Sequence, residues 1–325
     1  MKPVRWGVLG AANFALQQMA PAIHEATGAS LAALGTSSAD KAAPFQAFCP
    51  DLRVYTDYDA LLAADDIDAV YIPLPNHLHV AWTKKALLAG KHVLTEKPVA
   101  MQASEIDELI ALRDKTGLLA AEAYMIVHHP QWIRAKELYQ TGAIGNLLQV
   151  DGVFSYNNVD PENVRNKPET GGGGIRDIGV YTYGATRFVT GAEPKSLDAR
   201  LRYESGVDVV AEVSADFGNF RHRSVVSTRM FPRQHMTFHG DEGFFTLSAP
   251  FNAGVYGQAQ IEIHQPELAV RIERFPAVRQ YRLQVENFCH SVQTGAPYPC
   301  PLEFSRGTQE MIDMVFAAGG SGQQA

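Results

Sequence analysis

The first part of the chain alternates between short apolar runs and runs with helical periodicity. Apolar runs that fit buried strands stand at 5–10, 30–35, 67–72, 92–94 and 118–123. Helical runs extend from the first of them toward Glu25 and later cover 57–62, 80–88 and 104–116, where Ser104 is the expected cap. Strands and helices that alternate in this way need helices on both faces of a parallel sheet. The pattern therefore predicts a doubly wound α/β domain over residues 1–123.

The pattern changes after residue 123, where strands dominate. After a helix at 129–141, the runs expected to be strands are 147–154, 195–203, 207–217, 221–230, 235–240, 243–247 and 259–264. Two more helices are expected at 281–292 and 304–318, followed by a frayed tail at 319–325. Runs of strands after a βα domain indicate an α+β domain with a largely antiparallel sheet. We therefore predict a second domain over 124–325.

Composition and charge exclude several classes of protein. The formal net charge of -7 argues against a nucleic-acid footprint, which needs a basic face. No apolar run approaches the ~20 residues that span a bilayer, and the N-terminus enters a strand at once, which leaves no room for a signal peptide. Cys49, Cys289 and Cys300 are too few and too scattered for a disulfide framework or a Cys-x-x-Cys metal site. A cytoplasmic protein without nucleic-acid or membrane partners is expected.

The first strand ends in a glycine turn. Gly10, Ala12 and Ala15 occupy three positions of the dinucleotide fingerprint Gly-x-Gly-x-x-Gly/Ala. Gly10 would form the tight turn, Ala12 is small enough for a pyrophosphate to approach, and Ala15 allows close helix packing. An ordinary strand-to-helix turn would look similar, so the motif alone only favours a dinucleotide.

The residues after the second strand bear on which nicotinamide cofactor fits. NAD usually needs an Asp or Glu here to hold the ribose hydroxyls, whereas this chain has Thr36, Ser37 and Ser38, with Lys41 one turn on. Three hydroxyls and a cation, with no carboxylate before Asp40, favour the 2′-phosphate of NADP. The alternative is that Ser38 or Asp40 merely caps the following helix.

The loop after the 67–72 strand is rich in proline and ends in Asn76-His77-Leu78-His79. It lies at the carboxyl end of a strand, which is the edge of a parallel sheet where ligands bind. The two histidines could ligate a metal by type, but no third ligand is near. Packing against a cofactor is therefore favoured, and no metal is expected.

A lysine stands just beyond the 92–94 strand, in Glu96-Lys97-Pro98. The strand delivers Lys97 to the ligand-binding edge and Pro98 fixes the backbone beside it, so the amine is a positioned cation. The alternative is a solvated lysine in a surface loop. Glu96 is expected to fix the loop. The Lys97-Pro98 bond is a candidate for the cis form, because cis bonds occur almost only before proline.

Four consecutive glycines at 171–174 precede a helix that carries Asp177 and Tyr181. Bare glycine backbone lets a ligand approach closely. Asp177 and Tyr181 are four residues apart and share a helix face, so a carboxylate lies beside a phenol that can transfer a proton. The alternative is a flexible glycine loop followed by ordinary amphipathic-helix residues, Tyr181 and Tyr183 among them.

Together these motifs resemble the glucose–fructose oxidoreductase/inositol dehydrogenase (Gfo/Idh/MocA) family. The motifs that carry the resemblance are, in chain order, Gly7-x-x-Gly10, Pro75-Asn76-x-x-His79, Gly90-Lys91-His92-Val93, Glu96-Lys97-Pro98, Glu122-Ala123-Tyr124-Met125, His129-Pro130 and the glycine run through Tyr181. Tyr181 in place of His, together with Thr186-Arg187-Phe188, is similar to the glucose–fructose oxidoreductase, dihydrodiol dehydrogenase and xylose dehydrogenase branch. Val127 departs from the arginine that the family often carries there.

The resemblance implies an N-terminal Rossmann domain and a C-terminal domain whose open sheet face serves for contact in a dimer or tetramer. It implies Lys97, Tyr181 and Asp177 as catalytic residues. NADP, with NAD as the alternative, is the expected cofactor. The residues expected to bind it are Gly10, Ala12, Asn13, Phe14, Thr36, Ser37, Ser38, Lys41, Pro75, Asn76, His79, Glu96 and Lys97.

The expected reaction transfers a hydride between a sugar-like polyol, aldose or dihydrodiol and the nicotinamide. Tyr181 would take the hydroxyl proton, and Lys97 would lower the phenol pKa from ~10 and hydrogen-bond the reacting oxygen. Asp177 would bind a neighbouring substrate hydroxyl or orient Lys97.

Two alternatives stand beside this function. One is a keto-sugar reductase of the 1,5-anhydrofructose type, which runs the same site in reverse. The other is a dinucleotide-sensing regulator without catalysis, which is expected to lose the lysine or the tyrosine. The sequence leaves the substrate open. The 156–167 loop, with Tyr156, Arg165 and Asn166, suits a polyhydroxylated ligand, although polar loops are mostly just solvated.

Overall fold

The computed structural model describes residues 1–320, which fall into two compact units. The first comprises Met1–Met125 and Gln280–Arg306, and the second comprises Ile126–Arg279 and the chain from Gly307 on. The structure thus differs from the predicted boundary at residue 123, because the late segment 280–306 returns to the first unit. Residues 321–325 of the predicted tail lie outside the described chain. Within residues 1–320, no helix has the length and apolar character that crossing a membrane demands.

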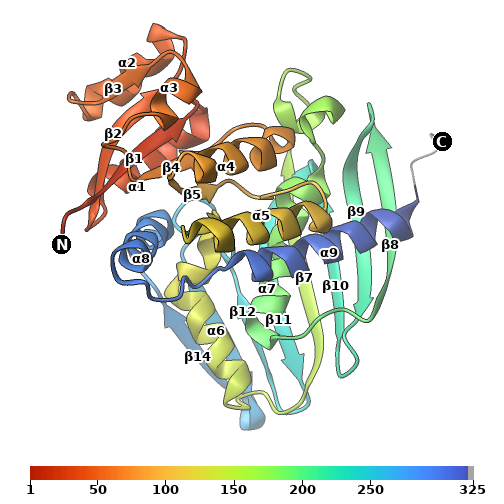
Figure 1. Cartoon of the computed structure of the whole chain (residues 1–325). Coiled ribbons are helices and arrows are strands. Elements are labelled where there is room, and N and C mark those ends of the chain that lie inside the picture. The colour runs from red at the N-terminus through yellow and green to blue at the C-terminus, as the bar shows by residue number, and fades with distance from the viewer. Residues whose placement is uncertain (321–325) are drawn as a thin grey trace. The chain divides into compact units, whose positions relative to one another are not determined.

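The first unit contains a six-stranded parallel sheet (Figure 1). Its strands are β1 (Val4–Leu9), β2 (Ala29–Gly35), β3 (Arg53–Tyr55), β4 (Ala69–Ile72), β5 (His92–Thr95) and β6 (Ala120–Glu122). They lie in the order β3-β2-β1-β4-β5-β6, with each neighbouring pair parallel. The direction of winding reverses between β1 and β4, and the space beyond their carboxyl ends is the usual ligand site of such sheets. The predicted doubly wound fold is confirmed, with β3 as an additional strand.

Helices cover both faces of this sheet. They are α1 (Ala20–Glu25), preceded by the π-helical turn η1 (Ala15–Met19), α2 (Ala39–Phe48), α3 (Tyr58–Leu62), the 3-10 turn η2 (Asn76–Leu78), α4 (His79–Leu88), α5 (Ala103–Thr116) and α8 (Gln280–Thr294). Successive strand residues point to opposite faces. The Trp6 ring lies 4.9 Å from that of Phe288 on α8, whereas a Cβ on Gly7 would meet Leu61 of α3 at 2.6 Å. Burial of Phe288 on β1 explains why α8 belongs to this unit.

The start of α5 differs from the prediction. Its N-cap is Gln102 rather than Ser104, and the helix begins at Ala103. The Glu105 carboxylate accepts the Gln102 backbone N–H at 3.0 Å. This return bond from the third helical residue is half of a capping box, and it fixes the cap at Gln102.

The second unit contains an eight-stranded sheet in the order β14-β13-β12-β11-β7-β10-β9-β8 (Figure 1). The strands are β7 (Leu147–Asn157), β8 (Ser196–Glu204), β9 (Val207–Asp216), β10 (Arg221–Ser227), β11 (Arg229–Gly240), β12 (Phe244–Leu247), β13 (Gln260–Gln265) and β14 (Ala269–Arg274). The β7–β10 pair is parallel and the other neighbouring pairs are antiparallel, which confirms the predicted α+β unit with a largely antiparallel sheet.

One face of this sheet is covered by helices. They are α6 (Pro130–Gln140), α7 (Val180–Thr190) and the part of α9 (Leu302–Gly319) from Gly307 on. Shorter turns are η3 (Met125–His128), η4 (Val164–Asn166), η5 (Pro168–Thr170), the π-helical η6 (Ile175–Gly179) and η7 (Pro266–Leu268). A Cβ on Gly319 would touch Leu201 of β8, and the guanidinium of Arg176 lies 4.7 Å from the Phe316 ring centroid. These contacts place α9 against β8 and against η6.

Candidate active site

The glycine turn after β1 offers bare backbone at the point where the winding reverses. Gly10 has a φ of +113°, and a Cβ there would lie 3.1 Å from Leu74 and 3.4 Å from the Tyr58 hydroxyl. The turn leads directly into the first helix, whose free N–H groups suit a pyrophosphate. Ala12 is half-buried and Asn13 is exposed in this turn. A turn that excludes a side chain and ends on free amides fits a dinucleotide.

The Phe14 side chain has a partner within the protein. Its ring packs edge-on against Tyr281 of α8 at 5.5 Å between centroids. We therefore assign its side chain to packing and leave only its backbone for a cofactor.

The loop after β2 leaves one hydroxyl and one amine exposed. Thr36 is buried, and the Ser38 hydroxyl accepts the Lys41 backbone N–H at 3.3 Å as the N-cap of α2. The capping alternative is therefore what the structure shows for Ser38. Ser37 and the Lys41 side chain remain on the surface beside the carboxyl end of β2. A hydroxyl and a cation at this place fit the 2′-phosphate of NADP better than a ribose diol.

The turn that carries Lys97 is fastened by its neighbour Glu96, as the sequence predicts. The Tyr71 hydroxyl of β4 donates to Glu96 Oε1 at 2.6 Å, and Glu96 Oε2 accepts the Lys97 backbone N–H at 3.2 Å. The Lys97-Pro98 bond is cis, which confirms that prediction. Lys97 itself is half-buried at the end of β5. Its backbone is therefore held while its side chain extends from a fixed origin.

His79 ties this turn to the loop after β4. The imidazole is fully buried, with Nδ1 2.7 Å from the Pro98 carbonyl oxygen and Nε2 2.7 Å from the Leu74 carbonyl oxygen. Burial lowers the pKa of His79 to about 4, so the ring is neutral near pH 7 and donates to one of the two carbonyls. Because both nitrogens face protein atoms, we assign His79 an indirect role: it places the Pro75-Asn76 loop and the lysine turn together.

Two further motif residues of the first unit serve the fold. Glu122 is buried, its pKa is raised by burial, and its Oε1 accepts the Val99 N–H at 2.8 Å, which secures the far side of the lysine turn. Lys91 is 7% exposed and donates its ammonium to the carbonyls of Ala64 and Ile67, both at 2.8 Å. Lys91 thereby closes the connection between α3 and β4.

In the second unit, the glycine run wraps a buried carboxyl group. Gly173 has a φ of +114°, and a Cβ there would lie 2.1 Å from Asp208 Oδ1. Asp208 of β9 is 2% exposed, accepts the Ile175 N–H at 2.6 Å, and has its pKa raised by burial to about 7. The run is thus a packed turn that starts the next helix, and the flexible-loop alternative is not what the structure shows.

Asp177 and Tyr181 follow this turn on one helical segment. Asp177 lies in the π-helical turn η6, a distortion that is frequent at functional sites, and Tyr181 lies in the first turn of α7. The Tyr181 ring packs against Phe154 and Phe251, with centroids 5.7 and 5.6 Å away. Asp177 Oδ2 accepts the Tyr156 hydroxyl at 2.6 Å and lies 3.0 Å from Arg165 Nε. The sequence did not predict this pairing of Asp177.

The predicted site residues therefore fall in both units. The cofactor-binding residues and Lys97 follow β1, β2, β4 and β5 along one edge of the first sheet, whereas Asp177 and Tyr181 belong to the second unit. Residues 1–320 contain no group of three or more His, Cys, Asp or Glu side chains that could hold a metal ion. His77, a metal candidate by type, is exposed on the surface.

Comparisons with known proteins point in the same direction. A profile of an oxidoreductase family with an NAD-binding Rossmann fold matches residues 4–124, and the GFO/IDH/MocA C-terminal domain profile matches residues 132–246. A dTDP-3,4-didehydro-2,6-dideoxy-alpha-D-glucose 3-reductase of Saccharopolyspora spinosa is 32% identical over 99% of this chain and 97% of its own. The D-xylose 1-dehydrogenase (NADP(+)) 2 of Haloferax volcanii is 28% identical over 98% of each chain.

A solved structure extends the likeness to the whole fold. KijD10, a 3-ketoreductase from Actinomadura kijaniata in complex with NADP and TDP-benzene, superposes with a TM-score of 0.90 at 28% identity and covers 97% of each chain. Solved forms of KijD10 include a variant with a tyrosine changed to phenylalanine and variants with a lysine changed to alanine or glutamate. With both domain profiles matched and relatives aligned from end to end, this chain belongs to the GFO/IDH/MocA family of oxidoreductases.

Proposed function

We propose that this protein is an NADP-dependent oxidoreductase that transfers a hydride to or from a sugar-like substrate, with Tyr181 as acid/base and Lys97 as polarising cation. The observation that carries the proposal is that hydrogen bonds hold the turn of Lys97 and that Tyr181 lies in the first turn of α7. The chain is also related to sugar reductases and dehydrogenases. In KijD10, the altered tyrosine and lysine stand the same number of residues apart as Tyr181 and Lys97 do here. This spacing supports the choice of the pair.

The chemistry needs one proton to move at one substrate oxygen. In oxidation the Tyr181 Oη takes the hydroxyl proton, and in reduction it returns a proton to the carbonyl oxygen. Lys97 Nζ donates a hydrogen bond to the same oxygen, and its positive charge lowers the phenol pKa from ~10 toward neutrality. The fastened backbone around Lys97 reduces the freedom that the amine must lose. NADP, when bound, supplies or accepts the hydride.

Two substrate classes fit this chemistry. The first is a polyol, aldose or dihydrodiol that is oxidised, and the H. volcanii xylose dehydrogenase favours it. The second is a keto sugar that is reduced, and both the S. spinosa 3-reductase and the 3-ketoreductase KijD10 favour it. Mixing the protein with NADP and aldoses or dihydrodiols, and with NADPH and free or dTDP-linked keto sugars, separates them by the change in nicotinamide absorbance. If the nicotinamide absorbance changes in none of these mixtures, the non-catalytic regulator is the remaining alternative.

Cofactor choice gives a first quantitative test. Replacing Lys41 by alanine should weaken NADP binding about 10-fold or more and leave NAD binding nearly unchanged, because one charge-assisted contact to a phosphate is lost. Fluorescence titration of both cofactors measures the ratio of their Kd values. Lys115→Ala, at an exposed lysine at the end of α5, is the matched control. Equal loss for the two cofactors would contradict a 2′-phosphate contact.

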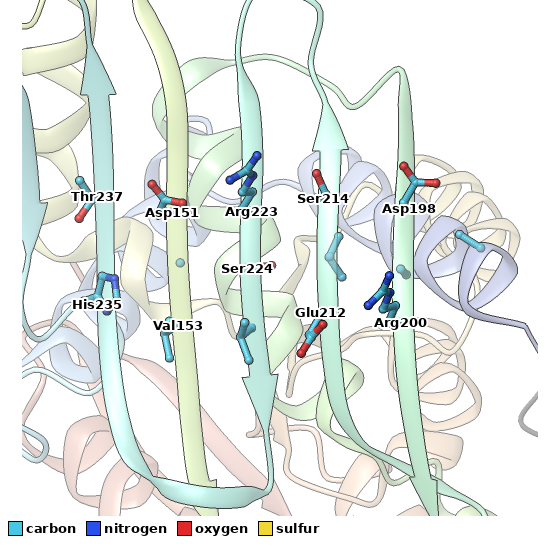
Figure 2. A pocket seen from close by; sticks show the side chains of 15 residues that line it. Asp151, Val153, Asp198, Arg200, Glu212, Ser214, Arg223, Ser224, His235 and Thr237 are labelled. Carbon is cyan, nitrogen blue, oxygen red and sulfur yellow. The ribbon is translucent and has the colours of Figure 1, made fainter. Parts of the chain in front are cut away.

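We also propose that the second unit joins a second copy of this chain through the open face of its sheet. Figure 2 shows this face, where side chains of adjacent strands line a cavity of about 960 Å³. The pairing register places Thr237, Asp151, Arg223, Ser214 and Asp198 in one row across adjacent strands. The neighbouring row holds His235, Val153, Val225, Glu212 and Arg200.

Both signs of charge stand in these rows: Asp151, Arg223 and Asp198 in the first, and Glu212 beside Arg200 in the second. A copy related by a two-fold axis presents the same rows reversed, so that it can set each cation opposite an anion. Replacing Arg223 by glutamate should therefore shift the oligomer toward the monomer by at least about tenfold in Kd, as measured by sedimentation velocity. Adding Asp151→Arg to that variant should restore association, and Lys115→Glu should leave it unchanged. A wild-type chain that sediments as a monomer throughout would end the proposal.

A further inference from the structure

An ion pair beside Tyr181 has no part in the mechanism above. Arg165, in turn η4, places its Nε 3.0 Å from Asp177 Oδ2. The same oxygen accepts the hydroxyl of Tyr156 from β7 at 2.6 Å. Asp177 precedes Tyr181 by one helical turn, so the pair lies on the face that presents the phenol.

The loop that carries Arg165 is built into the fold. The Gly173 N–H donates to the Arg165 carbonyl oxygen at 2.9 Å, and a Cβ on Gly172 would lie 2.5 Å from that oxygen. The Arg165 N–H donates to Asn163 Oδ1 at 3.1 Å. The backbone of Arg165 is therefore locked against the glycine run, and the guanidinium starts from a fixed point although 41% of its side chain is exposed.

We propose that Arg165 is a positioning residue for Tyr181: it neutralises Asp177 and thereby keeps an unpaired negative charge away from the acid/base. The inference rests on the proposed function of Tyr181. A carboxylate without its cation, one turn from a phenol, opposes formation of the phenolate that accepts the substrate proton. Arg165 removes this opposition while its ion pair holds the carboxylate in one orientation.

The groups around Tyr181 in the second unit agree with this role. They are Arg165 from η4, Asp177 on its own helical segment, Tyr156 on β7 and, beyond Tyr156, Arg229 on β11, whose Nε pairs with Glu204 at 2.7 Å. Asp177 raises the pKa of Arg165, and Tyr181 contributes to the same rise. Burial, with Asp177 second, raises the pKa of Tyr156, which stays a neutral donor. The Phe154 and Phe251 rings that pack against Tyr181 carry no charge. In the proposed mechanism, Lys97 is a further cation that acts on the phenol.

The pH profile of the reaction tests the inference. Arg165→Met should move the pKa in kcat/KM for alcohol oxidation by about one unit to the alkaline side, because a like charge then faces the phenolate. Arg165→Lys, which keeps the charge, should move it less. Adding Asp177→Asn to Arg165→Met should bring the pKa back, since the uncompensated carboxylate is gone. Arg271→Met, at an exposed arginine of β14, should leave the profile unchanged.

An unchanged profile in folded Arg165→Met would overturn the inference, and so would a loss of kcat/KM by the same factor at every pH. If Arg165→Met does not fold, Arg165→Gln keeps a donor for Asp177 and should show the same alkaline shift. Failure of this inference is distinct from failure of the proposed function. The second would appear as normal turnover in Tyr181→Phe, whereas the first appears as a fixed pKa in an enzyme that still needs Tyr181.

Discussion

Replacing Tyr181 by phenylalanine, or Lys97 by methionine, is expected to lower turnover at least ~100-fold while NADP binding stays largely intact. Tyr181→Phe removes the only atom of the side chain that can carry the proton. Lys97→Met removes the charge that makes a phenol with a pKa near ~10 useful at neutral pH. Turnover is measured by nicotinamide absorbance with the substrate found in the screen, and cofactor affinity by fluorescence titration.

Another tyrosine and another lysine of the chain provide matched controls for these two variants. Tyr183 lies two positions along the same helix, is fully buried, and its hydroxyl has no hydrogen-bond partner among the described residues. Tyr183→Phe should therefore keep nearly full turnover. Lys115→Met, at the surface of the first unit, should do the same. Near-normal turnover in Tyr181→Phe would remove the acid/base assignment, and with it the proposed mechanism.

Replacing Gly173 by alanine is expected to reduce the free energy of unfolding by about 3 kcal/mol or more. A left-handed backbone costs an L-residue roughly 1–2 kcal/mol, and overpacking against fixed atoms roughly 1–3 kcal/mol more. At Gly173 both apply, because φ is +114° and the new Cβ would lie 2.1 Å from Asp208 Oδ1. Urea denaturation followed by circular dichroism measures the loss.

Gly142 separates the two costs. It also has a positive φ, of +69°, but nothing lies within 4 Å of the position of its Cβ. Gly142→Ala should therefore cost only about 1–2 kcal/mol. If both variants lose the same stability, the contact with Asp208 does not hold the glycine run, and the run is no more than a turn.

The fold could be predicted largely because its strands and helices carry clear periodic patterns. The exceptions have physical reasons. β3 is only three residues long, too short to show alternation, and β14 has mostly exposed side chains on both faces. The apolar residues Val285, Phe288 and Cys289 of α8 are buried. The place of α8 in the first unit depends on a partner, Trp6, that stands far away in the sequence.

Candidate site residues could be chosen from the sequence where the chemistry follows from position along one strand. Lys97 and Glu96 stand out because they directly follow β5 at the ligand edge. Tyr71, His79 and Glu122 hold the turn of Lys97 by hydrogen bonds. These residues come close through the parallel pairing of strands and the crossing of a loop. Neither arrangement can be derived from the local sequence pattern.

Asp208 left a usable signal in the sequence. A carboxylate inside the apolar run Val207–Val210 indicates a buried polar group with a partner. The partner, the Ile175 amide at the end of the glycine run, could only come from the structure.

Lys91 and Lys97 lie six positions apart but differ in role: the first serves the fold, and the second is proposed to serve catalysis. The first spends its ammonium on two backbone carbonyls inside the protein, so its loss would be felt in folding. The second follows the last residue of β5, on a turn whose backbone Glu96 holds. Under the proposed mechanism, a protein that kept the Gly-Lys-His-Val stretch but lacked the lysine of Glu-Lys-Pro would share this architecture and show no turnover. The proposed mechanism therefore makes the second lysine the residue that separates an enzyme of this fold from a non-catalytic relative.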